Sequence, residues 1–240
     1  MEEVRVLVFK KNKKVRTIDP ARKLIASLDP KSPISEQYRT IRTNIQYSSI
    51  DNEIHTIMVT SSGPGEGKST SAANLAVVFA QLGKKVLLVD ADLRKPTAHR
   101  TFGVNNLFGF TTVLTKQATL EKTVIETEEK DLFILTSGPV PPNPAELLSS
   151  KSMEQFIESA QKLFDYIIFD TPPLLAVADP QIIANKVDGS IFVISSGKTE
   201  IELAKKAKEL LDNAQSKMLG VILNNKEMKN NDYYYYYGTK

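Results

Sequence analysis

The sequence predicts an α/β protein with a doubly wound, mainly parallel β-sheet. Short apolar runs, typical of strands buried on both faces of a parallel sheet, alternate with segments of helical pattern. Acidic residues directly follow two of these runs, and a glycine-rich turn joins a third run to a helix. The expected strands cover residues 57–59, 86–89, 132–135, 167–169, 190–194 and 218–223.

The expected helices lie between these strands. Residues 71–80 are rich in Ala and Leu and contain no Gly or Pro, which favours a helix. Segments 151–162 and 200–214 have the spacing of amphipathic helices. The alternation of strands and helices implies parallel strands with helices packed on both faces of the sheet.

The glycine-rich turn has the properties of a phosphate-binding loop. It joins the first expected strand to a helix, where free backbone N–H groups and the helix dipole attract anions. Glycine lets the backbone approach phosphate closely. Lys68 is expected to reach the β- and γ-phosphates, and the Ser69 hydroxyl to bind Mg²⁺. The predicted nucleotide-binding residues are Gly63, Gly65, Glu66, Gly67, Lys68, Ser69, Thr70 and, just beyond the last strand, Asn224.

The loop departs from the strict pattern G-x-x-x-x-G-K-[ST] at one position, because Ser62 stands where that pattern has glycine. Either the loop bends differently or Ser62 tolerates the conformation. A fortuitous glycine-rich turn is the alternative, and the flanking strand and helix argue against it.

Three aspartates follow two of the apolar runs. Asp90 and Asp92 come after residues 86–89, and Asp170 ends the run at 167–169. Ligands bind at the carboxyl ends of strands in open α/β sheets. Period-two spacing places Asp90 and Asp92 on the same side if the strand continues. A single such aspartate is more often a helix cap or a turn residue, but three beside a phosphate loop predict a functional site.

These motifs together resemble the bacterial tyrosine kinases (BY-kinases), which control synthesis and export of capsular and extracellular polysaccharides. The resemblance rests on Asp90-x-Asp92-x-Arg94, on Asp-Thr-Pro-Pro at 170–173 and on a tyrosine-rich tail, and it spans residues 31–240. Residues 138–144 also resemble a loop of that family. The expected domains are a basic extension at 1–30, a kinase domain at 31–225 and a flexible tail at 226–240.

The resemblance implies a role for each motif residue. Lys68 stabilises the transferring phosphoryl group, and Asp90 orients the tyrosine hydroxyl or accepts its proton. Ser69, Asp92 and Asp170 hold Mg²⁺, directly or through water, so ATP and Mg²⁺ are the expected cofactors. The catalytic set is therefore Lys68, Asp90, Asp92 and Asp170.

The resemblance also implies an assembly. Glu36, Arg39 and Arg42 match the E-x-x-R-x-x-R segment with which these kinases form rings, on a helix expected at 36–46. Family members of this kind form octamers and work with a separate transmembrane activator. The implied location is cytoplasmic, with recruitment by that partner to the inner face of the plasma membrane.

Five consecutive tyrosines near the end of the chain are the expected phosphate acceptors, reached from a neighbouring subunit. Each phosphate adds about −1.5 to −2 charges, enough in sum to disrupt an assembly. The alternative is an adhesive tail that packs on a partner. The tyrosines are Tyr233, Tyr234, Tyr235, Tyr236 and Tyr237.

Composition excludes several classes of function. A net charge of +3 is too small to indicate nucleic-acid binding, although residues 1–30 carry eight basic against four acidic side chains. The chain has no cysteine and therefore no disulfide or thiolate metal site. No apolar run approaches the roughly 20 residues that span a bilayer. The expected partners are a second copy of the chain, the transmembrane activator and other protein substrates.

Two other functions remain open from the sequence. A septum-positioning or partition ATPase would share the fold, but those proteins carry a signature lysine where this chain has Gly63, and they lack a tyrosine tail. The chain could also be a non-catalytic, ATP-binding regulator of a membrane polysaccharide complex. The presence of Lys68, Ser69, Asp90 and Asp92 argues against that function.

Overall fold

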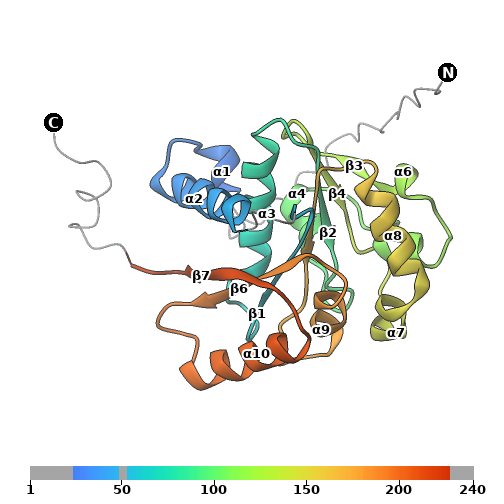
Figure 1. The fold of residues 1–240 in the computed structure, drawn as a ribbon. Coiled ribbons are helices and arrows are strands. Elements are labelled where there is room, and N and C mark those ends of the chain that lie inside the picture. Colours follow the sequence, from blue (N-terminus) through green and yellow to red (C-terminus); the bar gives the residue numbers. More distant parts are fainter. Residues whose placement is uncertain (1–23, 49–52, 228–240) are drawn as a thin grey trace.

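The computed structural model describes residues 24–48 and 53–227. Its centre is a seven-stranded sheet (Figure 1). The strands are β1 (Thr56–Ser61), β2 (Val86–Asp90), β3 (Ile125–Glu126), β4 (Leu132–Leu135), β5 (Tyr166–Asp170), β6 (Gly189–Ser195) and β7 (Met218–Asn224). Their order is β3-β4-β2-β5-β1-β6-β7, and every pair is parallel except β3 with β4. The predicted doubly wound, mainly parallel fold is confirmed.

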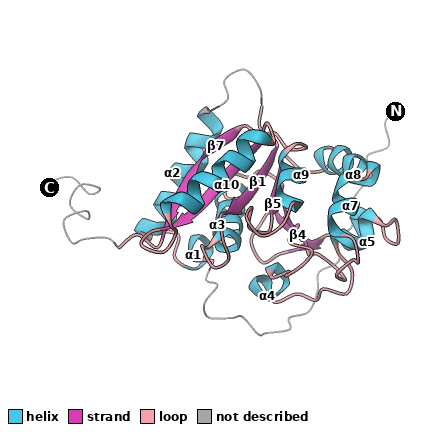
Figure 2. Ribbon diagram, turned by 90° about the horizontal axis from the view of Figure 1, so that it is seen from below, coloured by secondary structure: helices cyan, strands magenta, loops and turns pink. Residues whose placement is uncertain are grey.

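Helices cover both faces of the sheet (Figures 1 and 2). They are α1 (Ile25–Leu28), α2 (Pro33–Tyr47), α3 (Lys68–Ala80), α4 (Ala98–Phe102), α5 (Phe110–Leu114), α6 (Leu120–Thr123), α7 (Pro144–Ser149), α8 (Lys151–Gln161), α9 (Asp179–Ala184) and α10 (Ile201–Asn213). One core cluster joins α1, α2 and α3 to the sheet, and a second joins α5, α8, α9 and α10 to its other face. Residues of β1, β2, β5 and β6 alternate between these two clusters, which explains why their sequences are continuously apolar.

The order of the central strands positions the site. Strand β5 lies between β1 and β2, and Asp170 of β5 is level with both Val59 of β1 and Asp90 of β2. The phosphate loop follows β1, and the two other acidic segments end β5 and β2. Because parallel strands end at one edge of a sheet, all three segments converge there.

All six expected strands are present, with ends that differ by at most two residues from those predicted. Helix α3 begins three residues earlier than expected, because Gly67 caps it and the loop residues 68–70 form its first turn. Helix α2 is longer than the expected 36–46; Pro33 occupies its first turn, and the Ser32 hydroxyl accepts a hydrogen bond from Ser35 N–H.

Packed structure begins before residue 31, the expected start of the kinase domain. In α1, Ala26 is fully buried, its N–H donates to Asn74 Oδ1 at 2.9 Å, and its carbonyl accepts from Gln81 Nε2 at 3.0 Å. These contacts attach α1 to α3. The packed part therefore includes α1, while the division into an extension, a kinase domain and a tail stays a prediction.

Residues 1–23 and 228–240 lie outside the described part of the chain, and so do the five tyrosines expected to accept phosphate. Among the described residues, no helix combines the length and the apolar composition needed to cross a membrane.

Candidate active site

The phosphate loop needs glycine at two positions, for a shared conformational reason and, at one of them, also for lack of space. Gly65 and Gly67 have φ of 75° and 99°, in the left-handed region that favours glycine. At Gly67 there is also no space, since a Cβ would lie 2.0 Å from Asn224 Nδ2. That amide donates to the Glu66 carbonyl at 2.9 Å. The Asn224 side chain therefore holds the loop by binding the loop's backbone. The expected contact of Asn224 with the nucleotide base stays a prediction.

The Glu66 side chain turns inward and fastens the loop from within. Its carboxylate accepts from Ser62 N–H at 2.9 Å and from the Ser62 hydroxyl at 2.6 Å. It also accepts from Thr199 Oγ1 at 2.9 Å, and Thr199 lies in the loop between β6 and α10. Ser62 thus replaces the pattern's glycine without a positive φ, and its side chain and N–H bind the buried carboxylate. The Glu66 carboxylate therefore stabilises the conformation of the loop.

Lys68 lies between two of the three aspartates. Its Nζ is 3.2 Å from Asp92 Oδ2 and 3.3 Å from Asp170 Oδ1, and all three side chains are almost fully buried. Burial lowers the pKa of Lys68, but the charges of Asp170 and Asp92 outweigh it, and its pKa lies above the usual value. The amine is therefore a cation at neutral pH, at the place where the loop would present phosphates.

Asp90 occupies a different environment at the end of β2. Its Oδ2 accepts from the N–H groups of Thr97 and Ala98 at 2.9 and 2.8 Å, while its Oδ1 is buried and has no hydrogen-bond partner among the described residues. Burial raises the pKa of Asp90 to about 7, and the negative charge of Asp170 adds to the rise. A carboxylate with one open oxygen and a pKa near neutrality is suited to accepting a proton.

The strand ends at Asp90, so the extended conformation that would place Asp90 and Asp92 on one side does not continue. Asp92 lies in the following loop, where its Oδ1 accepts from Lys95 N–H at 3.0 Å and its Oδ2 contacts Lys68. Because of this turn the two carboxylates have different partners: Asp92 pairs with the Lys68 ammonium group, and Asp90 accepts hydrogen bonds from backbone N–H groups.

The charge of the site fits a divalent cation. Three buried carboxyl groups lie near a single buried ammonium group, so the sheet edge carries excess negative charge when all three are ionised. Burial raises the pKa of Asp170 as well, although Lys68 and a hydrogen bond from Ser69 oppose the rise. No group of three His, Asp or Glu side chains in the described chain forms a closed metal site. Mg²⁺ typically takes one or two carboxylates and completes its shell with phosphates and water, and Ser69, Asp92 and Asp170 fit that pattern.

Sequence reasoning missed an ion pair that joins two site loops. Arg94 Nε and Nη2 donate to the two carboxylate oxygens of Asp179 at 2.8 and 3.0 Å. Asp179, at the start of α9, is fully buried. The pair attaches the loop that carries Asp92 to the segment that follows Asp170. Arg94 belongs to the motif after β2, but nothing in the sequence indicates Asp179 as its partner.

The three residues expected to form a ring lie on α2, away from the nucleotide loop. Arg42 Nη1 donates to the Val78 carbonyl of α3 at 2.7 Å, so its guanidinium supports the chain's own fold. Arg39 pairs with Glu36 and donates to the Pro30 carbonyl at 2.6 Å. The Glu36 side chain is exposed, and that of Arg39 is partly exposed. Their role in a ring stays a prediction.

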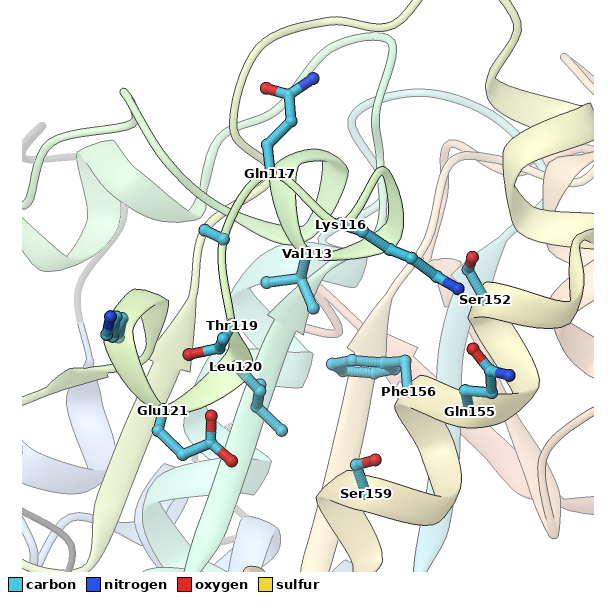
Figure 3. A pocket seen from close by; sticks show the side chains of 12 residues that line it. Val113, Lys116, Gln117, Thr119, Leu120, Glu121, Ser152, Gln155, Phe156 and Ser159 are labelled. Atoms are coloured by element: carbon cyan, nitrogen blue, oxygen red, sulfur yellow. The ribbon is translucent and has the colours of Figure 1, made fainter.

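Two hollows lie outside this site. One, of about 570 Å³, lies between α5, α6 and α8; Val113, Leu120 and Phe156 form its apolar part (Figure 3). The other, of about 430 Å³, lies between α10 and the edge of β6 and β7. Neither is lined by a residue of the phosphate loop or by an aspartate of the site. The candidate active site is instead defined by the converging loops after β1, β2 and β5.

Comparisons with known proteins agree with this geometry. The family described as an AAA domain matches residues 54–198. The tyrosine-protein kinase YwqD of Bacillus subtilis (strain 168) is 58% identical over 219 residues, 91% of this chain and 92% of the relative. The crystal structure of the chimerical protein CapA2B2 superposes with a TM-score of 0.83 at 42% identity, over 85% of this chain and 90% of that one. The kinase domain of the Escherichia coli tyrosine kinase ETK gives 0.82 at 32% identity, over 87% and 82%.

Proposed function

Since this chain belongs to the bacterial tyrosine kinases, we propose that it transfers the γ-phosphoryl group of ATP to the tyrosines of its own C-terminal cluster, from one copy to the next. The acceptors are Tyr233, Tyr234, Tyr235, Tyr236 and Tyr237. Phosphorylation of several tyrosines makes the tail strongly anionic and drives copies apart, and this cycle regulates the synthesis of capsular or extracellular polysaccharide.

Phosphoryl transfer needs positioning and charge stabilisation more than covalent chemistry by the protein. The phosphate loop binds the triphosphate through its backbone N–H groups, and Lys68 stabilises the charge on the transferring group. Ser69, Asp92 and Asp170 would hold Mg²⁺, which when bound neutralises phosphate charge. The tyrosine oxygen forms a bond to the γ-phosphorus, the bond from that phosphorus to the β–γ bridging oxygen breaks, and ADP leaves. Asp90 accepts the hydroxyl proton.

The observation that carries this proposal is the state of Asp90. Its Oδ1 is buried without a partner, and its pKa of about 7 is poised for proton transfer at neutral pH. Buried polar atoms without a hydrogen-bond partner are uncommon in folded proteins, and a catalytic role is one reason for them. The neighbouring ammonium group of Lys68 and the carboxylate of Asp170, 3.3 Å apart, support the proposal because ATP-dependent phosphoryl transfer uses a cation and a carboxylate of this kind.

Intact-mass spectrometry after incubation with ATP and Mg²⁺ tests the proposal, followed by mapping of the modified residues. We expect phosphoryl additions on residues 233–237 in the unsubstituted protein and none in Asp90→Asn. Each reaction is run with and without a peptide from a candidate activator. ATP hydrolysis with an unmodified tail in both conditions would refute the kinase proposal and favour a non-catalytic regulator or a partition-type ATPase.

Transfer between copies requires an assembly, and we propose a ring, an octamer, in which α2 of each copy contacts the next. Glu36 and Arg39 are the residues to change, because Arg42 supports the chain's own fold through the Val78 carbonyl. Glu36→Ala with Arg39→Ala is expected to lower the particle mass measured by light scattering. An unchanged mass would refute the ring.

The proposed setting is the cytoplasmic face of the plasma membrane. A transmembrane activator recruits the kinase there, and other proteins of the polysaccharide machinery are further substrates. Co-sedimentation of the chain with membranes that contain the activator, and not with membranes that lack it, tests this part of the proposal separately from catalysis.

A further inference from the structure

Strand β7 ends the sheet, and within the described part of the chain no strand pairs with its outer edge. Ser196 N–H, just after β6, donates to the Asn224 carbonyl at 2.8 Å, so the backbone of Asn224 faces β6. Successive residues of a strand turn their N–H and C=O groups to opposite sides. The N–H and C=O groups of Val221 and Leu223 therefore face away from β6, where an added strand can pair with them.

An apolar groove runs along the same edge. Val221 and Leu223 are 52% and 49% exposed, although both are large apolar side chains. They are level with Phe192 and Ile194 of β6, and with these two residues and Ile201 they line the hollow of about 430 Å³ beside α10. Helix α10 thus leaves the last strand partly uncovered. An unpaired edge with exposed apolar side chains is a template for a further strand.

Residues 4–9 have the sequence of a strand that fits this edge. They read Val-Arg-Val-Leu-Val-Phe and lie outside the described part of the chain. Branched and aromatic side chains favour strands. Because side chains alternate along a strand, Val4, Val6 and Val8 share one face. A face made only of valine matches a groove lined by apolar side chains.

We propose that residues 4–9 of the same chain add to β7 as an eighth, parallel strand. Val6 is then level with Val221 and Val8 with Leu223, so the valine face closes the groove beside α10. The outward N–H and C=O groups of these two β7 residues pair with the backbone of the added strand. The added strand covers an edge on which other copies of the chain could otherwise pair.

Charge favours the parallel direction. In the parallel register Glu2 is level with Lys217, which precedes β7, and Lys10 approaches Glu227 beyond its end. An antiparallel register that keeps the valines in the groove brings Lys10 towards Lys217 and Glu2 towards Glu227. Opposite charges on neighbouring strands stabilise their pairing, and like charges directly opposite each other destabilise it.

The chain is long enough for its own segment to reach β7. From Phe9 to Leu24, the first described residue, it advances by fifteen residues, which span up to about 50 Å when extended. The full width of a seven-stranded sheet is about 29 Å. Leu24 also packs against the same apolar cluster as Leu219 of β7. A second copy is therefore not needed to supply the strand.

The connection also has the favoured hand. It leads from the added strand through α1 and α2 to β1, over the face of the sheet that α3 covers, and away from β7 (Figure 1). The connection from β1 through α3 to β2 runs over the same face in the same direction. Connections between parallel strands are right-handed in about 98% of cases, and both connections share that sense.

Hydrogen exchange measured at single residues of the full-length protein tests the pairing. In the unsubstituted protein, the Val221 and Leu223 amides should exchange more than about tenfold more slowly than in the variant Val6→Asp with Val8→Asp. The two charges cannot enter an apolar groove without a large loss of hydration. The added strand is therefore lost in the variant, and its partner amides become open to solvent.

Two controls accompany this measurement. The Ile222 amide faces β6 and should be equally protected in both proteins. The matched variant is Lys13→Asp with Lys14→Asp, which places two aspartates on the same segment but beyond the proposed strand. Its β7 amides should exchange as those of the unsubstituted protein do.

A disulfide identifies the copy that supplies the strand, because the chain has no cysteine of its own. In Val6→Cys with Val221→Cys we expect a link within one chain. It should form about tenfold faster than in Val15→Cys with Val221→Cys, where the first cysteine is held only by a flexible tether. Non-reducing electrophoresis separates links within one chain from links between two chains.

Equal exchange of the Val221 amide with and without Val6→Asp and Val8→Asp would overturn the added strand. An equal loss of protection at Ile222 would overturn it too, because β7 itself would then have opened. Links formed at equal rates in the two cysteine pairs, or only between two chains, would overturn pairing within the same chain. Neither readout involves phosphate transfer, so this inference and the kinase proposal are tested separately.

Discussion

Replacement of Lys68 by Met removes the one positive charge that two buried carboxylates share. Asp92 and Asp170, whose side chains are 9% and 3% exposed, would then face each other without compensation in the nucleotide-free protein. Removing one partner of a buried ion pair typically costs about 3–5 kcal/mol. Both contacts are long, at 3.2 and 3.3 Å, and one carboxylate can be protonated, so we expect the lower end, about 3 kcal/mol at pH 8. The substitution therefore reduces stability as well as activity.

The pH dependence of this loss has a definite sign. Lys68 lowers the pKa of Asp170, whereas burial raises it, so the Lys68→Met substitution raises it further. A carboxyl whose pKa is higher in the folded than in the unfolded state stabilises the fold only while it is protonated. The stability difference between the unsubstituted protein and the variant should therefore shrink as the pH falls from 8 towards 5.

Urea unfolding of the nucleotide-free proteins at pH 8 and at pH 5.5 measures both effects. Lys198→Met is the matched control: the Lys198 Nζ also lies at the phosphate loop, 3.3 Å from the Gly65 carbonyl, but Lys198 is exposed and pairs with no carboxylate of the described residues. The control should change the unfolding free energy by less than about 0.5 kcal/mol. If Lys68→Met were as stable as the control at pH 8, the charge argument for the site would be refuted.

Three further predictions concern the rest of the site. If Asp90 accepts the tyrosine proton, the transfer rate should rise with pH around its pKa of about 7, and a flat rate profile between pH 6 and 8 would contradict that role. Arg94→Met should lower the unfolding free energy by about 1–2 kcal/mol in urea titrations, because it leaves the buried Asp179 carboxylate unpaired while solvent screens the 41% exposed Arg94 side chain; an unchanged unfolding free energy would refute this. Thr199→Val removes the hydroxyl that donates to Glu66, and calorimetry should show about fivefold weaker ATP binding, with full affinity as the contrary result.

The local features of the site, its glycine turn and its buried strands, could be predicted because each depends on residues that are consecutive in the sequence. Gly65 and Gly67 do require positive φ, and the apolar run before Asp90 is a strand buried on both faces. Each of these features follows from backbone preference or hydrophobic periodicity within one segment. The strand at 132–135 was predicted with its observed ends for the same reason.

Contacts between distant segments could not be predicted in this way. Nothing near Glu66 indicates that its carboxylate binds Thr199, 133 residues away, and nothing near Arg94 points to Asp179, 85 residues away. The interpretation of Glu66 as a nucleotide-binding residue came from its place in the motif, whereas its side chain points into the protein. Such pairs depend on which loops the sheet brings together.

The fold class, the glycine-rich loop and the three strand-end aspartates could be read from residue types at short spacing along the chain. How the aspartates divide their roles depends on the folded chain. Strand β2 ends at Asp90, so the chain turns and sends Asp92 to Lys68 while backbone N–H groups hold Asp90. Burial then raises the pKa of Asp90 to about 7. Desolvation depends on everything packed around a group, which only the folded chain supplies.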